Sequence, residues 1–176
     1  MTNSCVSGSL GGMVREVSAG GVVVRHTSAG WQMAAIEPQK ESATTLPVTR
    51  QKKTSQKMLL ALPKGLVDPG EKPAQTAARE VVEETGVTAV PVTKLGDIKY
   101  VYVRSWGDKA RVFKIVSFYL FRYESGEIDQ IAPEMRIEVK RALWIPLEDA
   151  SGKLAYRGEK DMVRRAQAYL EAHPEL

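Results

Sequence analysis

The amino-acid sequence predicts an α/β (α+β) fold in a single domain of the 176-residue chain. Short runs rich in β-branched and aromatic residues recur along the chain and are separated by turn sequences. Two segments carry helical signals instead, one near the middle of the chain and one at its end. Strands mixed with two well-separated helices are typical of a sheet that packs against helices around one hydrophobic core.

The first part of the chain is expected to form a hairpin followed by a loop. Residues 17–25 form a valine-rich strand, and residues 31–37 are its expected partner across a turn. Residues 38–57 are polar and show no hydrophobic period, so we expect an exposed loop there. Residues 59–62 are expected to form a short apolar strand that a proline ends.

The second part supplies both helices and three more strands. Pro73 opens a helix of about 13 residues that ends at Gly86, with proline in the first turn and glycine just past the end. The runs at 92–103, 112–121 and 138–145 are expected to be strands, and 112–121 is apolar enough to be buried on both faces. An amphipathic helix at 158–173 closes the chain.

Composition excludes several classes of protein. The chain has no run of about 18 apolar residues, so no membrane-spanning segment is expected. Residues 1–16 lack the regions of a signal peptide and are expected to be a flexible tail before a domain at 17–176. Cys5 is the only cysteine, which excludes an internal disulfide. These features predict a cytoplasmic protein, and the choice between monomer and dimer stays open.

Basic side chains are concentrated in residues 38–57. The chain has 25 Lys and Arg against 21 Asp and Glu, a net charge of +4, and this segment holds five basic side chains and one acidic side chain. The rest of the chain is therefore neutral overall. The segment has no aromatic residue to stack on bases, which argues against nucleic acid as a partner. It is either a solvated loop or a contact for a polyphosphate substrate.

Three carboxylates share one face of the middle helix. Glu80, Glu83 and Glu84 stand at positions i, i+3 and i+4, so their negative charges fall close together and repel. A divalent cation would offset this repulsion, and oxygen ligands favour Mg²⁺ or Mn²⁺. Arg79 is four residues before Glu83 and can reach back toward Glu71, as an orienting partner of carboxylates would.

The residues around this cluster follow a fixed spacing. The pattern is G-x5-E-x7-R-E-U-x-E-E-x-G-U, where U is a bulky aliphatic residue, and it is matched at every fixed position from Gly65 to Val87. This is the Nudix box, and the chain resembles the Nudix hydrolases. The resemblance implies an α/β/α sandwich with a mixed sheet. It also implies Mg²⁺-dependent hydrolysis of a nucleoside diphosphate linked to another moiety, with Glu71 orienting the box through Arg79.

The resemblance also assigns roles to the acids. Glu80 and Glu84 would be the main carboxylate ligands of the metal, and the Gly65 carbonyl would supply a further oxygen. Glu83 would be another ligand or would hold the attacking water. Family members often take one more acid from outside the box as ligand or general base. Glu138 and Glu134 are the local candidates, and we favour Glu138 because it opens an expected strand.

The flanking sequence narrows the resemblance to the diadenosine polyphosphate hydrolase branch. The strings that carry it are SAGGV at 18–22, LPKG at 62–65, KIVSFYL at 114–120 and YRGEK at 156–160. The implied reaction is cleavage of diadenosine tetraphosphate to ATP and AMP. Lys64 would contact a phosphate, and Tyr100, Tyr102 and Tyr119 are candidates for stacking on adenine.

Other functions fit the same box. One is a house-cleaning pyrophosphatase for damaged nucleoside triphosphates, and another is a diphosphoinositol or sugar-nucleotide hydrolase. A different class would be a non-catalytic nucleotide sensor or an RNA-binding protein. Such sensors typically lose acids of the box, and this chain keeps all of them.

Overall fold

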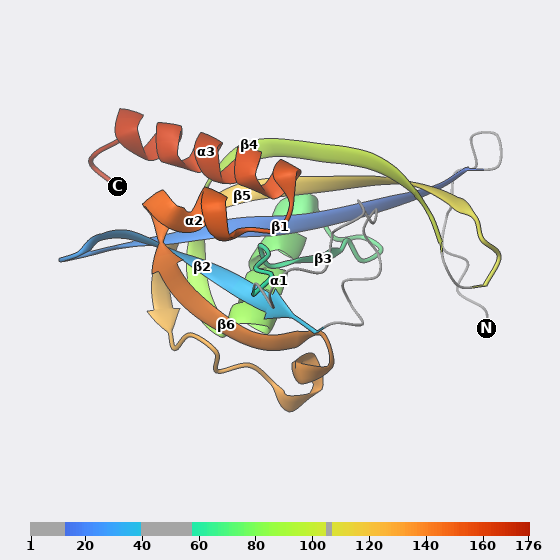
Figure 1. The fold of residues 1–176 in the computed structure, drawn as a ribbon, viewed down its shortest axis with the longest axis horizontal. Helices are drawn as coiled ribbons and strands as arrows, with labels where there is room; N and C mark the ends of the chain where they lie inside the picture. The colour runs from blue at the N-terminus through green and yellow to red at the C-terminus, as the bar shows by residue number, and fades with distance from the viewer. Residues whose placement is uncertain (1–12, 40–57, 105–106) are drawn as a thin grey trace.

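The computed structural model describes residues 13–39, 58–104 and 107–176. The expectations for residues 1–12 and for nearly all of the basic loop lie outside the described residues. In the described part, the chain forms six strands, three α-helices and one 3-10 helix. The predicted α/β fold is confirmed, with a mixed sheet between helices (Figure 1).

The sheet is built around its first strand. Over the described ranges its order is β4-β5-β1-β2-β6, and β3 pairs with β1. β1 (Met13–Thr27) runs parallel to β5 (Arg111–Gly126) and antiparallel to β2 (Gly30–Pro38). Residues 13–16, which were expected in the flexible tail, are therefore part of the sheet and pair with β5.

The remaining strands lie at the edges. β4 (Val87–Val103) is antiparallel to β5, β6 (Val139–Pro146) is antiparallel to β2, and the short β3 (Lys64–Leu66) is antiparallel to β1. β4 begins five residues before its expected start at residue 92. Pro91 interrupts the strand pattern, but β4 is an edge strand, where a proline is tolerated next to a register shift.

Helices cover both faces of the sheet (Figure 1). α1 (Pro73–Thr85) packs on one face, and α2 (Leu147–Lys153) and α3 (Arg157–Ala172) pack on the other. Side chains alternate along β1, so that Val23 joins the core beneath α1 and Val22 joins the larger core beneath α3. This arrangement is the layered sandwich that the sequence predicted.

The segment 59–62 differs from its expectation, because it is not a strand. Leu60 and Ala61 form only isolated bridges, Leu60 to Leu154 and Ala61 to Ile36. Successive residues turn to different partners, so no ladder can develop. The segment instead joins the start of the Nudix box to β2 and to the residue that follows α2.

Two short helices were not predicted from the sequence. These are α2 and the 3-10 helix η2 (Pro133–Ile137), which are too short for a helical period to show in the sequence. Because η2 ends at Ile137, β6 begins at Val139 and Glu138 precedes the strand rather than opening it.

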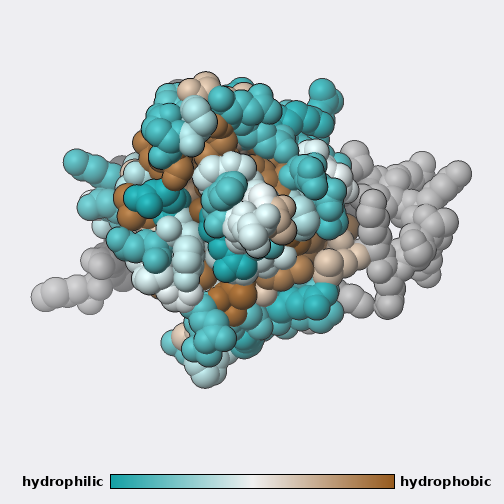
Figure 2. All heavy atoms as spheres, turned by 90° about the vertical axis from the view of Figure 1, so that its left-hand side faces the viewer, coloured by the Kyte–Doolittle hydropathy of each residue, from teal (hydrophilic) through white to brown (hydrophobic). Residues whose placement is uncertain are grey.

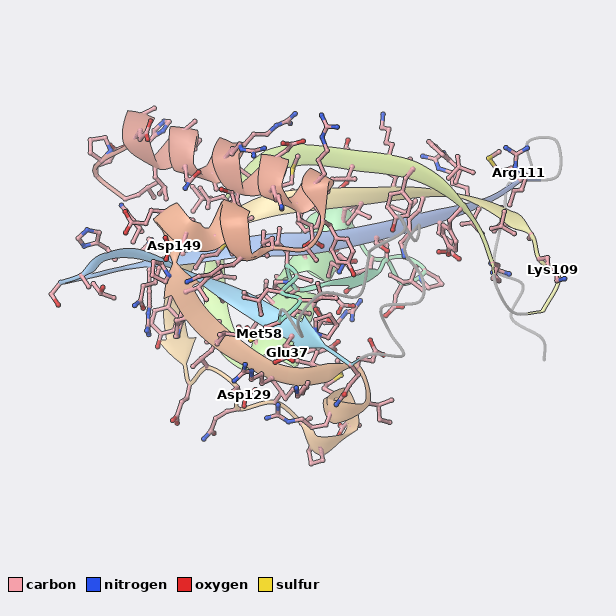
Figure 3. All side chains as sticks on the ribbon, in the orientation of Figure 1. Glu37, Met58, Lys109, Arg111, Asp129 and Asp149 are labelled. Atoms are coloured by element: carbon pink, nitrogen blue, oxygen red, sulfur yellow. The ribbon has the colours of Figure 1, made fainter. Side chains whose placement is uncertain are left out.

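The molecule is elongated along the β4–β5 hairpin. Lys109 and Arg111 lie toward the far end of this hairpin, opposite Asp149 on α2 (Figure 3). The end that carries the β1–β2 turn is covered mainly by hydrophilic residues, with hydrophobic patches between them (Figure 2). In the ranges that the structure describes, no helix has the length and apolar character needed to cross a membrane.

Candidate active site

Helix α1 places the acidic cluster on its last two turns. It begins at Pro73 and ends before Gly86, as the sequence predicted. Gly86 has φ of +81°, and a Cβ atom there would lie 2.6 Å from the carbonyl oxygen of Gln130. Glycine is therefore required for the chain to leave the helix at this point.

Arg79 lies at the centre of the acidic cluster. Its Nε and Nη2 atoms each donate a hydrogen bond of 3.0 Å to Glu71, and its Nη1 atom donates to Glu80 at 2.9 Å and to Glu83 at 3.0 Å. Thr76 donates to the same Glu71 carboxylate at 2.6 Å. The Arg79 guanidinium and the Thr76 hydroxyl lower the pKa of Glu71 to about 2. Arg79 therefore links the loop before α1 to two acids of the helix.

Glu80 and Glu84 are buried, and Glu80 shares the single charge of Arg79 with Glu71 and Glu83. The Lys64 backbone N–H donates to Glu84 Oε2 at 2.8 Å. Burial raises the pKa of Glu84 to about 8, and burial raises the pKa of Glu80 to about 7. Glu83 differs, because 40% of its side chain is exposed. The cluster is thus two carboxylates held in a low-dielectric site and one that reaches water.

Gly65 lies directly against Glu80. β3 pairs with β1 so that Gly65 is opposite Ala19, and a Cβ atom at residue 65 would come within 1.9 Å of Glu80 Oε1. Any side chain at residue 65 would therefore occupy the space of the carboxylate. The backbone of β3 and the buried acid of α1 form one continuous surface.

The donor set of this surface suits a hard cation. Glu80, Glu83, Glu84 and the Gly65 carbonyl offer only oxygen atoms, which Mg²⁺ and Mn²⁺ prefer. Two buried carboxylates with raised pKa values are the groups that an added positive charge would stabilise. In the described residues, no three acidic or histidine side chains yet converge on one point, and Arg79 holds an oxygen of both Glu80 and Glu83. An ion that binds would therefore share these two carboxylates with Arg79.

A cavity of about 680 Å³ opens beside the acidic cluster. This volume lies within the range of ligand sites, roughly 300–1,000 Å³. Its polar and aromatic lining consists of six acids, three cations and three tyrosines: Glu16, Asp68, Glu80, Glu83, Glu84 and Glu138, then Lys64, Arg79 and Lys114, and Tyr100, Tyr102 and Tyr156. The acids can hold cations, and the lysines and tyrosines can contact anionic or aromatic groups.

Glu16 lines the cavity and contacts three neighbouring polar side chains. It accepts a hydrogen bond of 2.9 Å from the Tyr102 hydroxyl, and it forms ion pairs with Arg104 at 3.3 Å and Lys114 at 3.7 Å. The Tyr100 and Tyr102 rings lie 6.1 Å apart. Burial and the Glu16 carboxylate raise the pKa of Tyr102 to about 12, so that its phenol stays protonated.

Two predicted residues lie away from the cavity. Tyr119 packs, partly buried, against the core beneath α1. Alternation along β5 explains this, because Lys114 and Phe118 face the opposite side of the strand. Glu134 is exposed on η2 and does not line the cavity, whereas Glu138 does.

Several residues of the site were missed by sequence reasoning. Glu16, Lys114 and Tyr156 line the cavity, and Glu159 contacts Lys64 at 3.4 Å. A signal was present for two of them. Lys114 is a cation at the start of an apolar strand, and Glu159 is an acid on the apolar stripe of the last helix, so each required a buried partner.

The metal-free protein is expected to lose stability as the pH rises from about 5 to 8. Folding raises the pKa of Glu80 to about 7 and that of Glu84 to about 8, from an ordinary 4.5. Between these values the folded state holds protons that the unfolded chain has released, so stability falls with rising pH. The expected fall is several kcal/mol, since each unit of pKa shift corresponds to about 1.4 kcal/mol.

Urea denaturation in the presence of EDTA, repeated at several pH values, measures this effect. Added Mg²⁺ should flatten the pH dependence, because an ion bound to the carboxylates favours the folded state. A metal-free stability that rises from pH 5 to 8 would contradict the prediction.

Residues 32–166 match the family model of the NUDIX domain. The chain is 32% identical over 158 residues, 90% of its length, to a Mycobacterium tuberculosis protein provisionally named mutator protein MutT4. It is 31% identical over 105 residues, 60% of its length, to the 8-oxo-(d)GTP phosphatase of Mycolicibacterium smegmatis. The chain spans 57% of the first relative and 29% of the second.

The fold is similar to a solved structure from Caenorhabditis elegans. The binary complex of an Ap4A hydrolase superposes with a TM-score of 0.62 and 21% sequence identity. The match covers 89% of this chain and 98% of that one. At this level of identity the similarity concerns the fold alone.

Proposed function

The chain belongs to the NUDIX domain family, and on that premise we propose that it is a divalent-metal-dependent pyrophosphohydrolase of nucleotide derivatives. One observation carries the proposal: the buried Glu80 carboxylate lies against Gly65 and the buried Glu84 carboxylate against the Lys64 backbone, at the wall of a cavity that is also lined by cations and aromatic rings. Burying two carboxylates destabilises the folded state, and a purely structural role would give no interaction that offsets this free-energy cost.

The chain's own residues divide the work. Glu80, Glu84 and the Gly65 carbonyl would hold Mg²⁺ or Mn²⁺, with Glu83 as a further ligand. When bound, such an ion polarises the pyrophosphate oxygens and offsets charge that develops during in-line displacement. Arg79 would keep the carboxylates oriented while the site is empty of substrate.

The attacking water needs a base near the acidic cluster. Glu83 and Glu138 both line the cavity, and Glu83 reaches solvent. Glu134 does not line the cavity and is therefore the weakest of the three candidates. We propose that one of Glu83 and Glu138 orients the water and accepts its proton.

The lysines and tyrosines that line the cavity suit a long polyphosphate. Lys64 would contact a phosphate. Burial opposes its charge, but the nearby Glu159 and Glu84 raise its pKa, so it stays charged. Tyr100 and Tyr102 could take an adenine ring. We therefore propose a dinucleoside polyphosphate such as diadenosine tetraphosphate, cleaved to ATP and AMP.

The leading alternative is a pyrophosphatase of damaged nucleoside triphosphates. It is supported by the matches to a mutator protein and to an 8-oxo-(d)GTP phosphatase. A sugar-nucleotide or diphosphoinositol substrate is compatible with the same cavity. We also propose that the protein acts in the cytoplasm, because a chain with a single cysteine suits a reducing compartment.

A substrate panel in ¹⁸O-labelled water tests the proposal. The full chain with Mg²⁺ is given diadenosine tetraphosphate, 8-oxo-dGTP and ADP-ribose, and the products are separated and weighed by mass spectrometry. ATP plus AMP supports the dinucleotide reaction, whereas pyrophosphate plus a nucleoside monophosphate supports the alternative. Absence of Mg²⁺-dependent hydrolysis across the panel would overturn the proposed function.

A further inference from the structure

Glu159 is a buried acid that reaches the segment before the Nudix box. Only 4% of its side chain is exposed. One carboxylate oxygen accepts a hydrogen bond of 3.0 Å from the backbone N–H of Leu62, and the other lies 3.4 Å from Lys64 Nζ. Glu159 lies in the first turn of α3, where the helix dipole favours a negative charge.

The start of α3 is a rigid support for this acid. A Cβ atom at Gly158 would lie 2.8 Å from Ile98, so the helix packs tightly on β4. Just before the helix, Leu154 forms a bridge with Leu60, and the Ala155 N–H donates to the Leu60 carbonyl at 2.9 Å. The segment before the box is therefore fixed at Leu60 to the residues that precede α3, and at Leu62 and Lys64 to Glu159 of α3.

Lys64 connects this support to the acidic cluster. Its ammonium group contacts Glu159, while its backbone N–H donates to Glu84 at 2.8 Å. The next residue, Gly65, lies against Glu80. A shift of this segment would therefore displace the Lys64 ammonium and the Gly65 backbone together.

We propose that Glu159 is a positioning residue for the reaction, acting through Lys64 and Leu62. This inference rests on the proposed function. Glu159 has two separable contacts. Its ion pair sets the direction of the Lys64 ammonium toward substrate phosphates, and its hydrogen bond to Leu62 holds the backbone that leads to Gly65.

Two substitutions separate these contacts. Glu159→Gln keeps an acceptor for the Leu62 N–H and removes the charge opposite Lys64. It is expected to raise KM for the preferred polyphosphate about tenfold with kcat within about twofold, because the lost contact bears on substrate binding. Glu159→Ala removes both contacts, so it is expected also to lower kcat about tenfold.

Metal affinity, measured without substrate, tests the contact between Glu159 and the Leu62 backbone. Calorimetric titration of Mn²⁺ into the substrate-free protein should give wild-type affinity for Glu159→Gln and roughly tenfold weaker affinity for Glu159→Ala. Glu171→Gln, an exposed acid on the same helix, is the matched control and should behave as wild type throughout.

A double-mutant cycle shows whether the ion pair is the route. In a Lys64→Met background, Glu159→Gln should raise KM by less than about twofold, because the group through which it acts is gone. An unchanged tenfold effect in that background would overturn the inference. The double variant should also melt at a higher temperature than Lys64→Met alone, which leaves a buried carboxylate unpaired.

The outcomes separate this inference from the proposed function. If the wild type hydrolyses its substrate while folded Glu159→Gln and Glu159→Ala keep wild-type KM, kcat and Mn²⁺ affinity, Glu159 has only a structural role and the inference fails. If the wild type itself hydrolyses nothing in the panel, the proposed function fails and the inference falls with it.

Discussion

Glu84→Gln is expected to lower kcat by about a thousandfold or more, which corresponds to about 4 kcal/mol of transition-state stabilisation. The Glu84 carboxylate is buried, lies beside Lys64, and would hold the metal. Glutamine keeps an oxygen that can accept the Lys64 N–H, but it removes the charge on which an ion depends. The variant should therefore stay folded while its catalytic activity is lost.

The same substitution should stabilise the metal-free protein at pH 8. Burial raises the pKa of Glu84 to about 8, so a charged carboxylate in this site opposes folding. A neutral amide removes that cost, and the expected gain is a few kcal/mol, at about 1.4 kcal/mol for each unit of the pKa shift. A protein that gains stability as it loses activity would identify Glu84 as a functional acid rather than a structural one.

Steady-state kinetics with Mg²⁺ and urea denaturation with EDTA measure the two effects on one preparation. Glu124→Gln, at an exposed position on β5, is the control and should change neither quantity. Near-normal turnover in folded Glu84→Gln would contradict the role of this carboxylate.

Gly65→Ala is expected to lower kcat/KM at least about a hundredfold, although it adds only one methyl group. The new Cβ atom would occupy a position 1.9 Å from Glu80 Oε1 and 2.5 Å from Glu80 Oε2. Either the Glu80 carboxylate or the β3 backbone must move. A displacement of about 1 Å in such a site is sufficient for a loss of this size.

Gly152→Ala is the matched control for this methyl group. A Cβ atom at Gly152 would meet nothing within 4 Å, and the residue lies in α2. Alanine should leave kcat/KM unchanged there and add roughly 0.5–1 kcal/mol of stability. Mg²⁺ titration of activity should show a higher half-saturating concentration for Gly65→Ala alone. Wild-type kinetics in Gly65→Ala would mean that Glu80 does not need its observed position.

Local patterns in the sequence predicted the elements that depend on neighbouring residues. The helix from Pro73 to Gly86 follows from its terminal residues, and the i, i+3, i+4 spacing places its acids on one face. The hairpin of β1 and β2 follows from two apolar runs around a turn. In contrast, residues 59–62 are not a strand, because their partners are chosen one by one from distant parts of the chain.

The composition of the cavity is a consequence of the tertiary structure. Glu16 meets Tyr102 across 86 positions, and Leu62 meets Glu159 across 97. Such contacts depend on strand register and on helix docking, neither of which a single sequence specifies. Tyr119 is a residue that the fold removes from the site: it was a candidate for stacking, but the alternation of side chains along β5 directs it away from the cavity.

By itself, the sequence determined the family, the acidic helix face and the type of ion that these oxygens suit, because these features reside in short-range spacing. Only the tertiary structure decided which acids are buried, what raises their pKa values and which side chains face them across the cavity. Burial and long-range electrostatics depend on the packing of all the layers at once. The tie from Glu159 through Lys64 to Glu84 is of this second kind: three charged residues from three parts of the chain that the fold brings together.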